Sequence, residues 1–180
     1  MKFTHRRRIA GLALLVCVLG RTVEGGTISK TRAQSLNNLR TTDRRLIDLI
    51  DQGLARSSTL SDLVLQLESA SVVAYLSRAA LPPRLAGRTR LMGTGHAWRY
   101  LSVEIDEKIS PLDVLTVLAH ELQHALEIAG AESVIDEVSL RALYRRIGVD
   151  SGGGAGKAFE TQDAVDMGRR VHQELMGWAW

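Results

Sequence analysis

The segment between Ser110 and Gly130 constrains the fold more than any other part of the chain. It opens with Ser110-Pro111, a helix cap followed by proline at the first helical position, and Asp113 stands three residues after the cap, as in a capping box. Apolar residues then recur on nearly every side of the expected helix, which can run to Ala129. A helix that is apolar around its whole circumference is buried at the centre of its domain.

This central helix carries His120-Glu121-Leu122-Gln123-His124, the pattern H-E-x-x-H. Four residues of helix place the two imidazoles on one face about one turn apart, where both can bind one zinc ion. Glu121 projects beside them, and a carboxylate next to a zinc-activated water can act as its general base. We therefore expect His120 and His124 to be zinc ligands and Glu121 to be catalytic. A pair of hydrogen-bonded core histidines beside a cleft is the alternative.

A catalytic zinc ion needs a third protein ligand, and Glu160 is the first candidate. It begins the stripe that we expect to face inward on a last helix from about Phe159 to Met176, where a carboxylate needs a cation or hydrogen-bond donors. That stripe continues with Ala164, Gly168, Val171 and Leu175. Gly168 would let this helix approach its neighbour, which we take to be the central helix. Alternatively, Glu160 only complements the dipole of the helix N-terminus.

Glu137 is the second candidate for the third ligand. Arg141 and Arg145 follow it at spacings of four residues, which is typical of a solvated, ion-paired helix face. His96 and His172 are further candidates, although an ordinary turn or surface position explains each of them. The metzincin extension of the motif is excluded, because it needs glycine at position 127 and histidine at position 130.

The remaining pattern predicts an α+β domain with a small antiparallel sheet packed against the central helix and further helices after it. Helices are expected over 43–55 and from Thr59 to Glu68, and a strand over 71–77 ends before Pro82-Pro83. Two strands over 88–92 and 98–106 follow, joined by a glycine-bearing turn, with apolar and polar residues alternating along the second. Ser133 and Asp136 repeat the capping pattern of Ser110 and Asp113 before a helix that ends near Ile147-Gly148.

The first twenty residues have the layout of a secretory signal peptide, with a basic start and an apolar run from Ile9 to Gly20. Four of the chain's 23 basic residues lie there, so the rest holds 19 basic and 20 acidic residues and gives no reason to expect a nucleic-acid partner. Residues 21–40 read as a linker or a disordered start, and 41–180 as the catalytic domain. Cys17, the only cysteine, lies in the leader, so a mature chain would have no disulfide.

On His120, Glu121 and His124, with Glu160 by position, the chain resembles the zincin metallopeptidases, and specifically their gluzincin branch. The similarity covers roughly Trp98 to Leu175, and HELQHA followed by Phe-Glu-Thr is also similar to short secreted bacterial sequences. In that family a strand antiparallel to the substrate precedes the active helix, a place that 98–106 occupies here. The resemblance implies zinc-dependent hydrolysis of peptide bonds in a peptide or protein substrate.

Several residues are candidates for supporting roles in this chemistry. The oxyanion of the reaction needs a stabilising donor, for which Tyr144, His96 and the arginines at 88, 90 and 99 are available. Gln123 and Glu127 are candidates for hydrogen bonds to the outer nitrogens of the zinc-binding rings. The alternative function is a zincin-fold module of the cell envelope that binds zinc without catalysis, and an uncleaved leader would make the chain membrane-anchored.

The leader predicts the N-terminus of the exported protein. Small residues suited to signal-peptide cleavage precede two possible cleavage points. They are Val18 and Gly20 for cleavage after Gly20, and Val23 and Gly25 for cleavage after Gly25. Mass spectrometry of the exported protein is expected to show a first residue at position 21 or 26. Recovery of the intact chain in the membrane fraction would instead identify the leader as an anchor.

Overall fold

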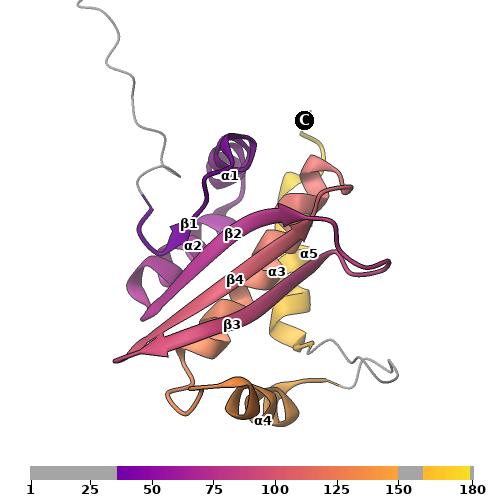
Figure 1. Ribbon diagram of the computed structural model, residues 1–180. Helices are drawn as coiled ribbons and strands as arrows, with labels where there is room; N and C mark the ends of the chain where they lie inside the picture. Colours follow the sequence, from indigo (N-terminus) through magenta and orange to yellow (C-terminus); the bar gives the residue numbers. More distant parts are fainter. Residues whose placement is uncertain (1–35, 150–159, 179–180) are drawn as a thin grey trace, which may run out of the picture.

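The computed structural model describes residues 36–149 and 160–178 (Figure 1). The expected leader, most of the expected linker and the glycine-rich residues 151–156 lie outside these ranges. Within them the chain is α+β, and none of its helices is long and apolar enough to cross a membrane. The elements are β1 (Leu39–Arg40), α1 (Arg44–Arg56), α2 (Ser58–Ser69), β2 (Val72–Ala79), β3 (Gly87–Gly95), β4 (Trp98–Asp106), α3 (Pro111–Ala129), α4 (Glu137–Ile147) and α5 (Gln162–Leu175).

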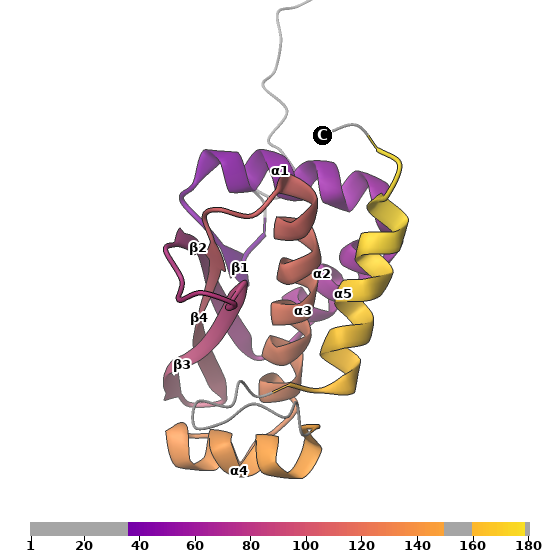
Figure 2. The same cartoon turned by 90° about the vertical axis from the view of Figure 1, so that its right-hand side faces the viewer.

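Helices α2, α3 and α5 lie on one side of the sheet, and α4 lies below the sheet and α3 in the view of Figure 2. Helix α3 packs against the sheet, and α5 lies on the side of α3 that faces away from the sheet. Nine residues of α3 are buried, spread around its circumference, and among its residues only Pro111 and Asp113 are exposed. The sequence-based prediction of a buried central helix is therefore confirmed.

The sheet is mixed and has the strand order β1-β2-β4-β3, so the expectation of an antiparallel sheet is wrong. Only β3 and β4 form the predicted hairpin, whereas β2 pairs with β4 in parallel and β1 pairs with β2 in parallel. The alternation of apolar residues in 98–106 correctly predicted which face of β4 is buried. It carries no information about the direction of the neighbouring strand, which depends on how the loop after β2 crosses the sheet.

The first strand begins inside the stretch expected to be a linker. Leu39 is buried, and the side chain of Asn38 donates to the carbonyl oxygens of Leu67 and Ala70 at 2.8 and 3.0 Å. Glu68 of α2 accepts hydrogen bonds from the backbone in the same stretch. The folded part therefore begins a few residues before position 41.

Gly168 brings α5 close to α3, as the sequence indicated. A Cβ atom at this position would lie 3.2 Å from the carbonyl oxygen of Thr116 and 3.5 Å from the Cβ atom of His120. Ala164, Val171 and Leu175 of the predicted stripe are buried on the same helix. The helix begins at Gln162 behind the cap Thr161, so Glu160 precedes the helix rather than belonging to it.

Helix α2 begins before the predicted start at Thr59, because its cap is Ser57. The Ser57 hydroxyl accepts from the Leu60 amide at 3.0 Å. The side chain of Thr59 is held elsewhere, since its hydroxyl donates to Glu174 of α5 at 2.6 Å. Ser57 donates to the same carboxylate at 2.5 Å, which makes Glu174 the bridge between α5 and the start of α2.

Glu174 is expected to stabilise the fold in a pH-dependent way. Burial alone would raise the pKa of this carboxyl, but hydrogen bonds from Ser57 and Thr59 outweigh it and lower the pKa below the usual value. The ionised form is thus favoured in the folded state, and its contribution is present above about pH 4.5 and lost as the pH falls through the lowered pKa. We expect Glu174→Gln to lower the free energy of unfolding by about 1 kcal/mol at pH 7 and by less at pH 3.

Urea unfolding at both pH values measures this difference, with Glu132→Gln as the control because Glu132 is an exposed carboxylate. An equal loss at pH 7 and pH 3 would show that the ionised carboxylate has no special role.

Candidate metal centre

Three side chains with metal-binding atoms meet on the α5 side of α3. The Nε2 atoms of His120 and His124 are 3.1 Å apart, and Glu160 Oε1 lies 3.5 Å from His120 Nε2. All three ligand atoms lie within 4.8 Å of one another. Two of these residues come from α3, and Glu160 comes from the segment that leads into α5. The structure therefore brings together the three residues that the sequence nominated as ligands.

The distances suit a single tetrahedral ion. Two nitrogens that each lie about 2.0 to 2.1 Å from one zinc ion are separated by about 3.4 Å in tetrahedral geometry. The His120–His124 and His120–Glu160 separations of 3.1 and 3.5 Å are close to this value. Two imidazoles and one carboxylate are also a donor set typical of catalytic zinc. The residues present can thus hold a metal ion.

Glu127 fixes the orientation of His124. Its Oε2 atom lies 2.9 Å from His124 Nδ1, and its Oε1 atom accepts from the hydroxyl of Thr161 at 2.7 Å. A carboxylate that accepts from Nδ1 leaves the lone pair of the neutral ring on Nε2, which is the nitrogen directed at His120. The predicted role of Glu127 beside a ligand ring agrees with this contact.

The ring of His124 is also packed by an aromatic side chain. The ring of Tyr144 on α4 lies edge-on to it, with centroids 5.4 Å apart and an interplanar angle of 84°. Both residues are buried. The imidazole of His124 is therefore held on two sides, by a carboxylate and by a ring.

Glu121 points from α3 toward the sheet and is only 5% exposed. Its Oε2 atom accepts from the Thr89 hydroxyl of β3 at 2.7 Å. Its Oε1 atom lies against Gly87, where an added Cβ atom would be 2.5 Å away. Thr89 and Gly87 are functional candidates that the sequence analysis missed. Only the packing of β3 against α3 brings them next to Glu121.

The electrostatics of the cluster favour a cation. Burial raises the pKa of Glu121. The hydrogen bond from His120 lowers the pKa of Glu160, and the same contact raises the pKa of His120 although burial opposes it. Burial likewise opposes the shift at Glu127, where hydrogen bonds from His124 and Thr161 lower the pKa. The lowered pKa values of Glu160 and Glu127 favour their ionised forms beside the two imidazoles, and a divalent cation would offset this negative charge.

Glu160 reaches the cluster for a different reason from the one expected. It is not on the inward stripe of α5 but forms an isolated antiparallel bridge with Val149, two residues before the helix begins. The amide of Val149 donates to the Glu160 carbonyl at 2.9 Å. This bridge, together with the Thr161 cap, fixes the backbone from which the carboxylate extends.

The other candidates for the third ligand lie elsewhere. Glu137 is exposed at the start of α4 and pairs with Arg141 at 3.4 Å, as its spacing predicted. His96 is exposed in the β3–β4 turn with φ +54°, and His172 contacts the Thr116 hydroxyl through Nδ1 at 3.2 Å. Neither histidine belongs to the metal-binding group found among residues 36–149 and 160–178.

The arginines nominated as oxyanion donors are directed away from Glu121. Arg88 and Arg90 pair with Glu104 of β4 at 2.6 and 3.0 Å. Because side chains alternate along a strand, these arginines lie on the opposite face of β3 from Thr89. Arg99 is 7% exposed and donates to the carbonyl oxygens of Ala97 and Ala131.

Tyr144 was also a candidate donor to the oxyanion, but its hydroxyl is engaged elsewhere. Its hydroxyl donates to the carbonyl oxygen of His124 at 3.5 Å, and burial raises its pKa. It is directed at the backbone of α3 rather than into the pocket beside Glu121, whose described lining does not include it.

The strand beside the site is β3 rather than β4. Strand β4 pairs with β2 on one edge and β3 on the other, so it has no free edge for an extended peptide. The expectation that 98–106 faces a substrate is therefore wrong. Strand β3 is the terminal strand of the sheet and carries the contacts to Glu121.

A pocket of about 340 Å³ opens beside the cluster. His120, Glu121 and Glu160 line it from one side, and Gly87 lies on the β3 side. Its charged lining is completed by two arginines that the sequence analysis did not single out. The described lining is Arg84, Leu85, Ala86, Gly87, Thr116, Val117, His120, Glu121, Glu160, Val165, Gly168 and Arg169.

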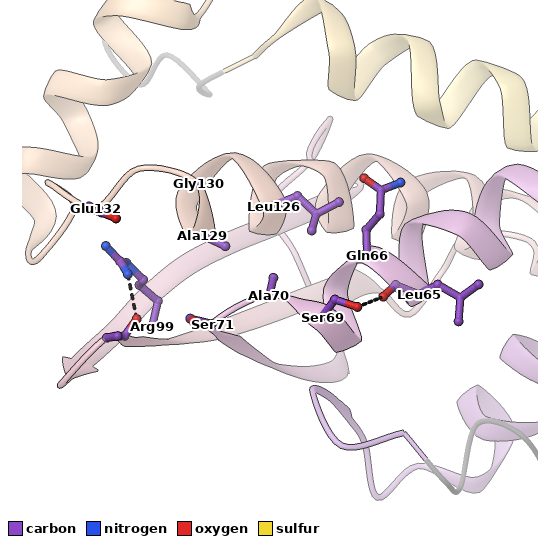
Figure 3. Close-up of a pocket in the computed structure, with 11 residues that line it drawn as sticks. Leu65, Gln66, Ser69, Ala70, Ser71, Arg99, Leu126, Ala129, Gly130 and Glu132 are labelled. Atoms are coloured by element: carbon purple, nitrogen blue, oxygen red, sulfur yellow. Dashed lines mark hydrogen bonds between the residues drawn. The ribbon is translucent and has the colours of Figure 1, made fainter.

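A larger open pocket, of about 900 Å³, lies away from the histidines, between the end of α2 and the end of α3 (Figure 3). Arg99 and Glu132 are its charged lining residues, and small or apolar side chains such as Ala129 and Leu126 form much of the rest. It contains none of the cluster residues. The candidate site is therefore chosen by the chemistry of the residues that line the smaller pocket, and not by pocket size.

Comparison with known proteins gives no match: no protein-family model, no curated protein and no solved structure is significantly similar to the chain.

The ligand assignment predicts how zinc affinity responds to substitution. Glu160→Gln replaces the carboxylate oxygen by a weaker neutral donor and is expected to lower zinc affinity at least 10-fold, the lower end of what loss of a supporting group costs. Glu137→Gln changes an exposed, ion-paired carboxylate of similar size and is expected to leave the affinity unchanged. Competition with a chromogenic chelator measures both. Equal losses, or no loss in either variant, would contradict the ranking.

Proposed function

We propose that the protein is an exported, zinc-dependent metallopeptidase of the zincin type, with His120, His124 and Glu160 as zinc ligands. The observation that carries this proposal is the meeting of three ligand atoms within 4.8 Å beside a buried carboxylate, Glu121, that lines the same pocket. Zinc held there would supply Lewis acidity, which polarises a carbonyl group and lowers the pKa of bound water to about 7.

Glu121 is placed to act as the general base. Its carboxylate is buried, and Thr89 holds Oε2, which leaves Oε1 on the side of Gly87 and the pocket. Burial raises the pKa of this carboxyl, which makes its carboxylate a stronger base toward the attacking water. Glu121 would take a proton from the attacking water and pass it to the leaving amine of the peptide.

The free edge of β3 offers a route for the substrate. As the terminal strand, β3 has unpaired backbone groups on its outer edge, and extended peptides bind such edges by adding a strand. Gly87, at the start of β3, also lines the pocket with Glu121. A peptide paired with this edge would pass beside the cluster, which supports a peptide or protein substrate.

The general-base role is tested by Glu121→Gln. The substitution keeps the shape of the side chain and removes a buried ionisable group, so folding and one bound zinc ion per chain are expected to persist. Hydrolysis of a peptide library is expected to fall at least 100-fold, the typical contribution of a positioned general base. Zinc content by elemental analysis and cleavage by mass spectrometry measure the two properties on the same sample.

Glu132→Gln is the matched control, since Glu132 is exposed and lies outside the pocket. Normal cleavage by Glu121→Gln would refute the assignment of the base. Zinc-loaded wild-type protein that cleaves nothing, but loses thermal stability on chelation, would favour the non-catalytic zinc module instead.

A further inference from the structure

Arg84 occupies a backbone position that normally holds glycine. The amide of Leu85 donates to the carbonyl oxygen of Pro82 at 3.1 Å, which closes a turn over Pro82-Pro83-Arg84-Leu85. Arg84 is the third residue of this turn and has φ +72°. A type II turn requires a positive φ at this position, which favours glycine or asparagine, so the turn itself does not explain an arginine. Residues held in this region are often functional.

Arg84 is one of the residues that line the pocket of the metal cluster. It shares this lining with Glu121 and Glu160 and is exposed to solvent. Both carboxylates have hydrogen-bond partners of their own, Glu121 with Thr89 and Glu160 with His120. Within residues 36–149 and 160–178 the ion pairs found do not include Arg84.

Arg169 is the other arginine at this pocket, but its side chain is engaged. It pairs with Asp166, one turn earlier on α5, at 2.8 Å. Arg84 is therefore the guanidinium of the described lining that is available to a ligand. A guanidinium binds a carboxylate through two parallel hydrogen bonds. A hydroxyl or an amide group of a peptide does not offer the two equivalent acceptor oxygens that this geometry needs.

We propose that Arg84 binds a carboxylate of the substrate and makes the site selective for peptides with an acidic group close to the cleaved bond. This inference rests on the proposed peptidase function. The negative charges of Glu121 and Glu160 would repel such a group, and a cation on the pocket lining offsets that repulsion. The carboxylate comes either from an aspartate or glutamate side chain or from the C-terminus of the peptide.

Four peptide pools test the inference and separate these two sources. The pools share one sequence set and differ only in carrying Glu or Gln at the varied position and a free or amidated C-terminus. Zinc-loaded wild-type protein is expected to cleave one carboxylate-bearing pool with a kcat/KM about 10-fold above that of its neutral counterpart, the effect of one charge-assisted hydrogen bond pair. A preference for Glu over Gln identifies the side chain, and a preference for the free terminus identifies the C-terminus.

Arg84→Gly is the decisive variant, because glycine adopts φ +72° without strain and the turn is preserved. It is expected to reduce the preference ratio to about 1 with an unchanged melting temperature, while Arg84→Lys retains part of the ratio. Arg145→Gln, an exposed position of α4 outside the pocket, is the control and should keep the wild-type ratio. Because the ratio compares two substrates on one protein, a general loss of folding or zinc does not alter it.

A binding measurement separates failure of this inference from failure of the proposed function. Calorimetric titration of the same peptides into zinc-loaded Glu121→Gln, with and without Arg84→Gly, needs no turnover and is expected to show the same preference. If the wild type cleaves nothing, the peptidase function fails while the titration still decides the role of Arg84. A preference that survives Arg84→Gly, or that disappears in Arg169→Gln instead, overturns the assignment, as does the absence of any carboxylate preference in both assays.

Discussion

The burial of ionisable side chains on α3 is the constraint on which the rest of this structure depends. Glu121 and His124 are each 5% exposed in a helix that is otherwise largely apolar, and charged or polar groups in such a place are costly unless they are paired. His124 pairs with Glu127 of the same helix, whereas Glu121 and His120 find their partners on other elements. The sheet provides Thr89 for Glu121, and the segment before α5 provides Glu160 for His120.

Two glycines let the neighbouring elements come close enough for these contacts. Gly87 of β3 lies against Glu121, where a side chain would collide with the carboxylate and with Val117. Gly168 of α5 lies against the backbone of Thr116 and the Cβ atom of His120. Glu121 thus packs against a glycine of β3, and His120 packs against a glycine of α5. The site is a product of close packing on both sides of α3.

Much of the fold follows from local sequence patterns, and most exceptions share a cause. The extent of α3 and the antiparallel pairing of β3 with β4 depend on residues close together in the chain, and they agree with the prediction. The cap of α4 was predicted wrongly, because Asp136 pairs with Ser139 instead of with Ser133. The parallel pairing of β2 with β4 joins segments separated by the β3 hairpin strand. The choice of cap in α2 depends on Glu174, more than a hundred residues away. Patterns among neighbouring residues in the sequence do not predict contacts between distant segments.

The same division separates the parts of the candidate site. The sequence alone determined that His120, Glu121 and His124 share one turn of a buried helix, because helical spacing fixes the geometry of residues four positions apart. Tertiary structure decided that Glu160 completes the cluster from outside α5, that Thr89 and Gly87 contact Glu121, and that Arg84 lines the pocket. These positions depend on how β3, α3 and α5 pack, and packing is set by contacts between distant segments that no local periodicity encodes.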